Sequence, residues 1–297
     1  MQSNNPVFRR SEGFNTSGTN AYGNQTYAGN GSAHQGYGQT GYTDPATWGT
    51  GTPGQPGTTP VTPGVDHGPM TIDSVVQKTA ISLFLVLAAA AATWIMTPAI
   101  DSTTTTDELG SLIAAMTIGS LAAFALSLVN SFKRVISPAL VMAFAIAEGI
   151  ALGALSKFFD AQFGGGIVTQ AVIGTFAAFG GTLAAYKFFN IQVGNKFRTM
   201  VVAAVFGMVG LSLIEVVLGL FNSQLGLFGF GGVGLLFSIV GLVLGVFMLV
   251  LDFDFVEQGV ANGIPERESW RAAFGMTVSL VWIYTNLLRI LAIFSDN

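Results

Sequence analysis

Hydrophobic and polar positions divide the 297-residue chain into a polar N-terminal part and a strongly apolar remainder. Residues 1–70 are rich in Gly, Thr, Asn, Gln and Pro, and nearly everything after Thr71 falls into long apolar blocks. Seven blocks are about 20 residues or longer, enough to cross ~30 Å of hydrocarbon as helices. They are Lys78–Ile100, Gly110–Phe132, Ile136–Phe158, Ile167–Phe189, Thr199–Phe221, Gly229–Asp252 and Ala272–Phe294.

Backbone groups cannot stay unpaired in lipid, so these blocks are predicted to be helices. The alternation of apolar and polar residues that marks a membrane β-barrel is absent. We therefore predict an all-α membrane protein, with a seven-transmembrane-helix bundle over residues 71–297 and a tail over residues 1–70. The tail cannot bury enough apolar surface to offset its ordering entropy, so we expect it to be disordered.

The basic residues predict the orientation of the bundle. With the tail inside, one side holds ten of the twelve Lys and Arg residues, and the connection "DSTTTTDELG" on the other side carries acids only. The positive-inside rule then places the N-terminus in the cytoplasm and, after seven crossings, the C-terminus outside. The ten are Arg9, Arg10, Lys78, Lys133, Arg134, Lys187, Lys196, Arg198, Arg267 and Arg271.

Composition excludes several classes of seven-helix protein. The chain has no cysteine, and its two histidines, His34 and His67, both lie in the tail. The membrane part therefore has no Ser–His pair and no H-E-x-x-H metal motif. The last block, Ala272–Phe294, has no lysine for a retinal Schiff base. We expect no enzymatic activity and no cofactor, and a net charge of −4 gives no reason to expect a nucleic-acid partner.

Four acids lie within or at the end of apolar blocks, where a charge costs roughly 2.5–3.5 kcal/mol at a helix centre. Glu148 lies in the middle of the third block and is expected to face the bundle interior, as a functional site or as a hydrogen-bonded structural acid. Glu215, nearer the outer end of the fifth block, is the weaker candidate. Asp252 and Asp254 lie where the sixth block reaches the cytoplasmic side, and they point about 200° apart on a helix. One is expected to face the bundle and the other water or a loop, unless both simply mark the helix exit.

Small residues recur at four-residue spacing in two blocks. They are Ala145, Gly149 and Gly153 in the third block and Gly241 and Gly245 in the sixth. Such spacing lets helix backbones approach closely in lipid, and we interpret these residues as packing positions.

Several segments together resemble the Bax inhibitor-1 (YccA-like) family of integral membrane proteins. They are the glycine-rich third helix "PALVMAFAIAEGIALGALSKFFD", the basic link "YKFFNIQVGNKFR" and the aspartates of the sixth block. The polar tail before "MTIDSVVQKTA" and the ending "WRAAFGMTVSLVWIYTNLLRILAIF" resemble its bacterial branch with extended N-termini.

The resemblance implies a last helix wrapped by the other six and a pH-sensitive calcium leak channel. In the family an aspartate pair, one acid on helix six and one on helix seven, senses protons. Asp252 or Asp254 matches the first acid, whereas the place of the second falls near Ser279, because no acid lies between Glu268 and Asp296. Glu148 could supply a second carboxylate in its stead.

The leading hypothesis is therefore a cation channel of the bacterial plasma membrane, with Ca²⁺ as the ion and protonation controlling opening. Asp252, Asp254 and Glu148 are the gating candidates, and Glu215 and Ser279 are weaker ones. The expected partners are the lipid bilayer and Ca²⁺ or H⁺. One alternative is a proton-coupled transporter, for which "GGVGLL", Gly231 to Leu236, would be a helix break. The other is a membrane interaction protein whose tail regulates a stress or quality-control complex.

Overall fold

A computed structural model describes residues 68–100, 106–164, 166–189 and 191–295, together with two short strands nearer the N-terminus. The strands, β1 (Gly18–Thr19) and β2 (Gln25–Thr26), pair antiparallel. The predicted disordered tail otherwise lies outside the described residues, and its boundary at residue 70 stays a prediction.

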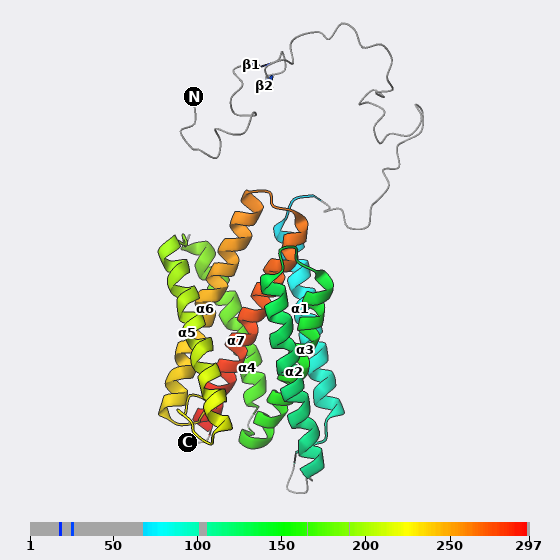
Figure 1. Cartoon of the computed structure of the whole chain (residues 1–297), viewed down its shortest axis with the longest axis vertical. Coiled ribbons are helices and arrows are strands. Elements are labelled where there is room, and N and C mark those ends of the chain that lie inside the picture. The colour runs from blue at the N-terminus through cyan, green and yellow to red at the C-terminus, as the bar shows by residue number, and fades with distance from the viewer. Residues whose placement is uncertain are drawn as a thin grey trace, which may run out of the picture. The chain divides into compact units, whose positions relative to one another are not determined.

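Seven α-helices are long and apolar enough to cross a membrane, which confirms the predicted all-α fold class for the described residues. A 3₁₀ helix, η4, precedes the last of them (Figure 1). The helices are α1 (Ile72–Met96), α2 (Thr106–Phe132), α3 (Pro138–Phe163), α4 (Ile167–Phe188), α5 (Asn195–Leu220), α6 (Gly232–Ala261), η4 (Glu266–Glu268) and α7 (Ser269–Ser295).

The largest error in a predicted helix boundary is at the C-terminal end of α6. The sixth apolar block ends at Asp252, but α6 continues to Ala261, and Gly263 follows with a φ of 61°. The end of an apolar run marks where side chains stop favouring lipid, whereas the backbone can stay helical beyond that point. Asp252 and Asp254 therefore lie inside α6 and do not mark the end of the helix itself.

Helix α7 occupies the middle of the bundle. It packs against α1, α3, α4 and α6, while α2 packs on α3 and α5 packs on α6. Figure 1 shows α7 in red running between these helices. Ile283 and Leu288 of α7 are completely buried. The expected arrangement, six helices wrapped around the last, is thus reached with four helices in extensive contact with α7 and two further out.

The small residues of α3 allow close contact with α1. A Cβ added to Gly149 would lie 2.7 Å from Ala89 Cβ, and one added to Gly153 would lie 2.9 Å from Ala90 Cα. Real Cβ atoms essentially never approach so closely. The stripe predicted from sequence spacing is therefore a helix-packing surface, as small-residue stripes in membranes usually are.

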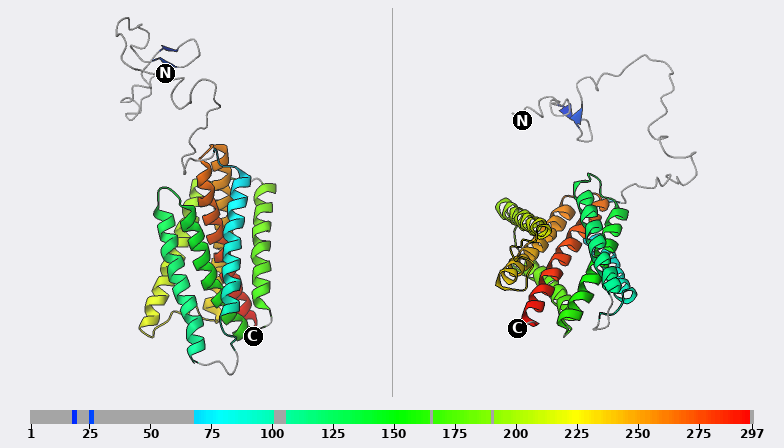
Figure 2. Two further views of the ribbon diagram at one scale, coloured as in Figure 1. Left: turned by 90° about the vertical axis from the view of Figure 1, so that its right-hand side faces the viewer. Right: turned by 60° about the horizontal axis from the view of Figure 1, so that its bottom comes forward.

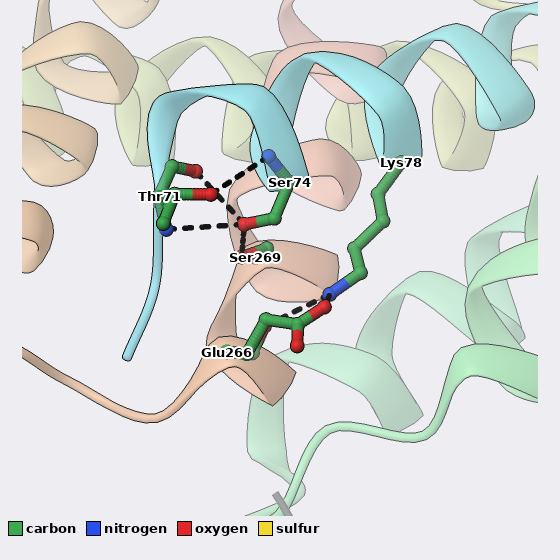
Figure 3. Close-up of polar contacts among 5 residues, drawn as sticks. All are labelled: Thr71, Ser74, Lys78, Glu266 and Ser269. Carbon is green, nitrogen blue, oxygen red and sulfur yellow. Dashed lines mark hydrogen bonds and ion pairs between the residues drawn. The ribbon is translucent and has the colours of Figure 1, made fainter. Parts of the chain in front are cut away.

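Polar contacts join the start of α1 to the start of α7 (Figure 3). Thr71 and Ser74 form a capping box at the N-terminus of α1, and Ser74 Oγ lies 2.7 Å from Ser269 Oγ. One turn further along α1, Lys78 Nζ donates to the carboxylate of Glu266 at 2.9 Å and to its carbonyl oxygen at 3.0 Å. This junction ties the N-terminal end of the central helix α7 to the N-terminal end of α1. The C-terminal end of α6 leads into the same region of the bundle.

Candidate functional site

Asp252 lies on the side of α6 that faces α7. Its Oδ2 accepts a hydrogen bond of 2.6 Å from Ser279 Oγ, and Ser279 is buried. A side chain at Gly275, one turn before Ser279, would come within 2.8 Å of Asp252 Oδ1, so the glycine leaves room for the carboxylate. Asp252 and Ser279 line a cavity of about 350 Å³ with residues of α2 and α5. The structure thus brings together two residues that sequence reasoning had placed on separate helices.

Asp254 points toward α5 instead. Its Oδ2 accepts 2.7 Å and 2.8 Å hydrogen bonds from Arg198 Nη2 and Gln258 Nε2. The expectation that the two aspartates face different ways is therefore met, but Asp254 is buried rather than turned to water or a loop. Arg198 lies in the first turn of α5, so Asp254 lies at the level where that helix begins.

Sequence reasoning missed the polar residues around Asp254. Arg198 had been counted only as an inside charge, and the hydrogen bond of 2.6 Å from Tyr186 Oη of α4 to Glu257 Oε2 of α6 was not foreseen. The signal was available, because Asp254, Glu257 and Gln258 lie within about one helical turn of one another on α6. These contacts join α4 and α5 to α6. Asp254 therefore has a structural role, which makes it a weaker candidate for the gate than Asp252.

Glu148 lines a different cavity. This space of about 300 Å³ lies among α2, α3 and α7, and no hydrogen bond or ion pair of the Glu148 side chain is seen among the described residues. Ser127 and Val278 line both this cavity and the one at Asp252. The structure thus places Glu148 and Asp252 in adjoining cavities rather than in one carboxylate pair.

Glu215 is a buried structural acid. Its carboxylate accepts hydrogen bonds from the backbone N–H groups of Leu225, Gly226 and Leu227, at 2.8 Å, 3.0 Å and 3.1 Å. Arg289 Nη2 of α7 donates to the carbonyl oxygen of Leu227 at 2.7 Å. Glu215 therefore fixes the connection between α5 and α6, and this geometry favours the structural interpretation that the sequence had left open.

The described residues contain no group of three or more His, Cys, Asp or Glu side chains that could hold a metal ion. A cation near Asp252 would meet one carboxylate, the hydroxyls of serines on α2 and α7, and the apolar walls of the cavity. Such a site is suited to brief contact rather than tight binding, and conduction requires that binding be weak enough for the ion to leave.

These features define a multi-pass helical membrane protein with acidic side chains inside its apolar helices. The family model described as Bax inhibitor 1 like matches residues 5–296, so the chain belongs to the Bax inhibitor family. It is also 28% identical over 158 residues to an uncharacterized protein of Chlamydia muridarum. That match covers 52% of this chain and 63% of the relative, so the chain spans less than two thirds of that protein's length.

Proposed function

We propose that this protein is a pH-sensitive cation leak channel of the bacterial plasma membrane, that Ca²⁺ is the ion, and that Asp252 is the gate. The topology proposed with it has the N-terminus in the cytoplasm and the C-terminus outside. The family membership supports a multi-pass membrane protein. The activity, the ion and the orientation are our proposals.

The observation that carries this proposal is the contact between Asp252 and Ser279. A carboxylate in a membrane helix usually serves an ion or proton pathway, because its burial is costly. Asp252 has a hydroxyl partner on the central helix and a cavity beside it, but no cation within ion-pair distance among the described residues. Asp254, by contrast, is neutralised by Arg198.

The pathway proposed for the ion runs along the two adjoining cavities. Serines of α2 line it, with Ser127 and Ser131 at the Asp252 cavity and Ser120 and Ser127 at the Glu148 cavity. Carboxylates and hydroxyls are oxygen ligands, which a hard cation such as Ca²⁺ prefers. Protonation of Asp252 removes the negative charge at the contact with α7. In this proposal that change of charge is the proton-sensitive step of channel opening.

Calcium entry into proteoliposomes across pH 5 to 8 tests this proposal. Wild-type protein is expected to pass Ca²⁺ at a rate that varies with pH, whereas Asp252→Asn is expected to hold one rate at every pH. Glu148→Gln is expected to lower the rate and keep the pH dependence. Asp73→Asn, an exposed acid in the first turn of α1, is the matched control. Absence of flux in folded wild-type protein would overturn the channel proposal.

The transporter alternative loses its structural argument. Helix α6 begins at Gly232 and continues without a break to Ala261, so the segment Gly231 to Leu236 forms a helix start. The interaction-protein alternative rests on the tail and is tested by deleting residues 1–68. A lost phenotype with intact Ca²⁺ flux would favour it over the channel.

A further inference from the structure

A further cavity lies away from the acids of α6. It has a volume of about 620 Å³, within the range of small-molecule pockets, and is lined by α1, α3, α4 and α7. Helices α1 and α4 flank it, and each packs on α7 and α3 rather than extensively on the other. The left view of Figure 2 shows α1 in cyan and α4 in yellow-green on this face of the bundle.

The cavity opens toward lipid. Leu87 and Ile95 of α1 and Phe176 of α4 line it and are 47%, 80% and 47% exposed on the outer surface of the bundle. A molecule dissolved in the bilayer could therefore enter sideways between α1 and α4.

Three hydroxyl groups inside the cavity are already hydrogen-bonded. Ser156 Oγ donates to the carbonyl oxygen of Leu152 at 2.5 Å and lies 2.6 Å from Tyr284 Oη. Because the one proton of Ser156 is used, Tyr284 is the donor in the second bond. Thr175 Oγ1 donates to the carbonyl oxygen of Ala171 at 2.7 Å. The interior thus suits an apolar chain.

The length of the cavity matches one leaflet. Leu83 and Trp94, eleven residues apart on α1, both line it, which corresponds to about 16 Å of helix. Half of the ~30 Å hydrocarbon core is about the same length. Trp94 lies in the last turn of α1 and Asp160 in the last turn of α3, so both lie near the ends of membrane-spanning helices, where we place the lipid headgroups.

The end of the cavity at the last turns of α1 and α3 carries the carboxylate of Asp160 and the indole ring of Trp94. Asp160 lines the cavity, and no hydrogen bond or ion pair of its carboxylate is seen among the described residues. The nearby cation, Lys157, donates all three protons to the end of α1: to Trp94 O at 2.7 Å, to Thr97 Oγ1 at 3.2 Å and to Thr97 O. A carboxylate and an indole that line one cavity favour an ammonium group, through charge and through cation–π attraction. An anionic headgroup would meet a like charge.

We propose that this cavity binds a bilayer lipid with an ammonium headgroup, with one acyl chain between α1 and α4 and the ammonium at Asp160 and Trp94. The lipid comes from the leaflet that contains the α1–α2 and α3–α4 connections. Binding at this site is separate from the Asp252 contact and does not depend on the channel proposal.

Native mass spectrometry of the full chain tests the proposal. The protein is equilibrated with equal amounts of phosphatidylethanolamine and phosphatidylglycerol that have identical acyl chains, and retained lipid is counted. We expect the wild type to retain the ethanolamine lipid at least threefold more than the glycerol lipid. Asp160→Asn is expected to abolish this preference, and Asp73→Asn, which keeps Asp160, is expected to leave it unchanged.

A second variant tests the cavity itself. Ala91 lines the cavity from α1 and is exposed, so Ala91→Trp fills the space without disturbing a buried contact. It is expected to lower total retained lipid by at least threefold. Equal retention of the two lipids by the wild type would overturn the headgroup assignment. Undiminished retention by Ala91→Trp would overturn the assignment of the cavity as the lipid site.

Discussion

Replacement of Gly149 by alanine should weaken the packing of α1 on α3. The new Cβ would lie 2.7 Å from Ala89 Cβ and would also clash with the backbone oxygen of Val86. Ordinary van der Waals contact begins at 3.4 Å, so the helices must separate locally by at least about 0.7 Å. A backbone oxygen cannot rotate away as a long side chain can, which makes this strain hard to relieve.

The magnitude follows from two opposing effects. Overpacking a well-packed contact costs about 1–3 kcal/mol. Replacing a glycine by alanine within a helix returns up to about 1 kcal/mol, because alanine loses less backbone entropy. The expected net loss is therefore about 1–2 kcal/mol of unfolding free energy for Gly149→Ala.

A control with the same chemistry lies in α4. A Cβ added to Gly180 meets nothing within 4 Å, so Gly180→Ala should be neutral or should stabilise the protein by up to about 1 kcal/mol. Unfolding of both variants by increasing fractions of sodium dodecyl sulfate in mixed micelles, followed by tryptophan fluorescence, measures the difference. If Gly149→Ala proved as stable as Gly180→Ala, the close approach of α1 and α3 would be refuted.

Three further outcomes are expected. Glu215→Gln should loosen the connection between α5 and α6 by about 1–3 kcal/mol, because a neutral amide replaces a carboxylate that holds three N–H groups, and hydrogen exchange at Leu225–Leu227 should accelerate. Lys78→Met should destabilise the start of α1 by about 2 kcal/mol, because it removes the charged hydrogen bonds that Lys78 Nζ donates to the carboxylate and the carbonyl oxygen of Glu266, and thermal unfolding against the wild type would reveal the loss. Ser279→Asp should raise the pH at which Ca²⁺ flux changes, because a new carboxylate against that of Asp252 makes a pair that retains a proton more readily than one carboxylate does; an unchanged pH profile would contradict this.

The sequence predicts the helices well because membrane insertion depends on side-chain composition. An apolar run of sufficient length has few alternatives in lipid, so all seven α-helices were predicted. Most of the predicted helix ends lie within a few residues of the observed ones. Helix α6 is the exception, because the polar segment after Asp252 continues the helix. The packing role of Gly149 was also readable, since its four-residue spacing from Gly153 requires no knowledge of the partner helix.

The partners of the buried acids were not predictable in the same way. Hydrophobicity shows that Glu215 is costly to bury, but not that a loop ten residues away folds back to satisfy it. The same holds for Asp254, whose partner Arg198 lies 56 positions earlier in the chain, on α5. The relative rotation of packed helices decides which acid is neutralised, and that rotation depends on all contacts at once.

The hydrogen-bond donors around each acid distinguish the structural carboxylates, Glu215 and Asp254, from the proposed gate, Asp252. Glu215 and Asp254 each have strong donors, so their charges are stabilised and cannot change without loss of structure. Among the described residues Asp252 has one neutral donor, Ser279, and that hydroxyl can also accept a hydrogen bond from a protonated carboxyl. Its contact can therefore persist in both charge states, with the hydrogen bond reversed. A group that can gain a proton without losing its partner is suited to sensing pH, which is why Asp252 stands ahead of the other acids as the proposed gate.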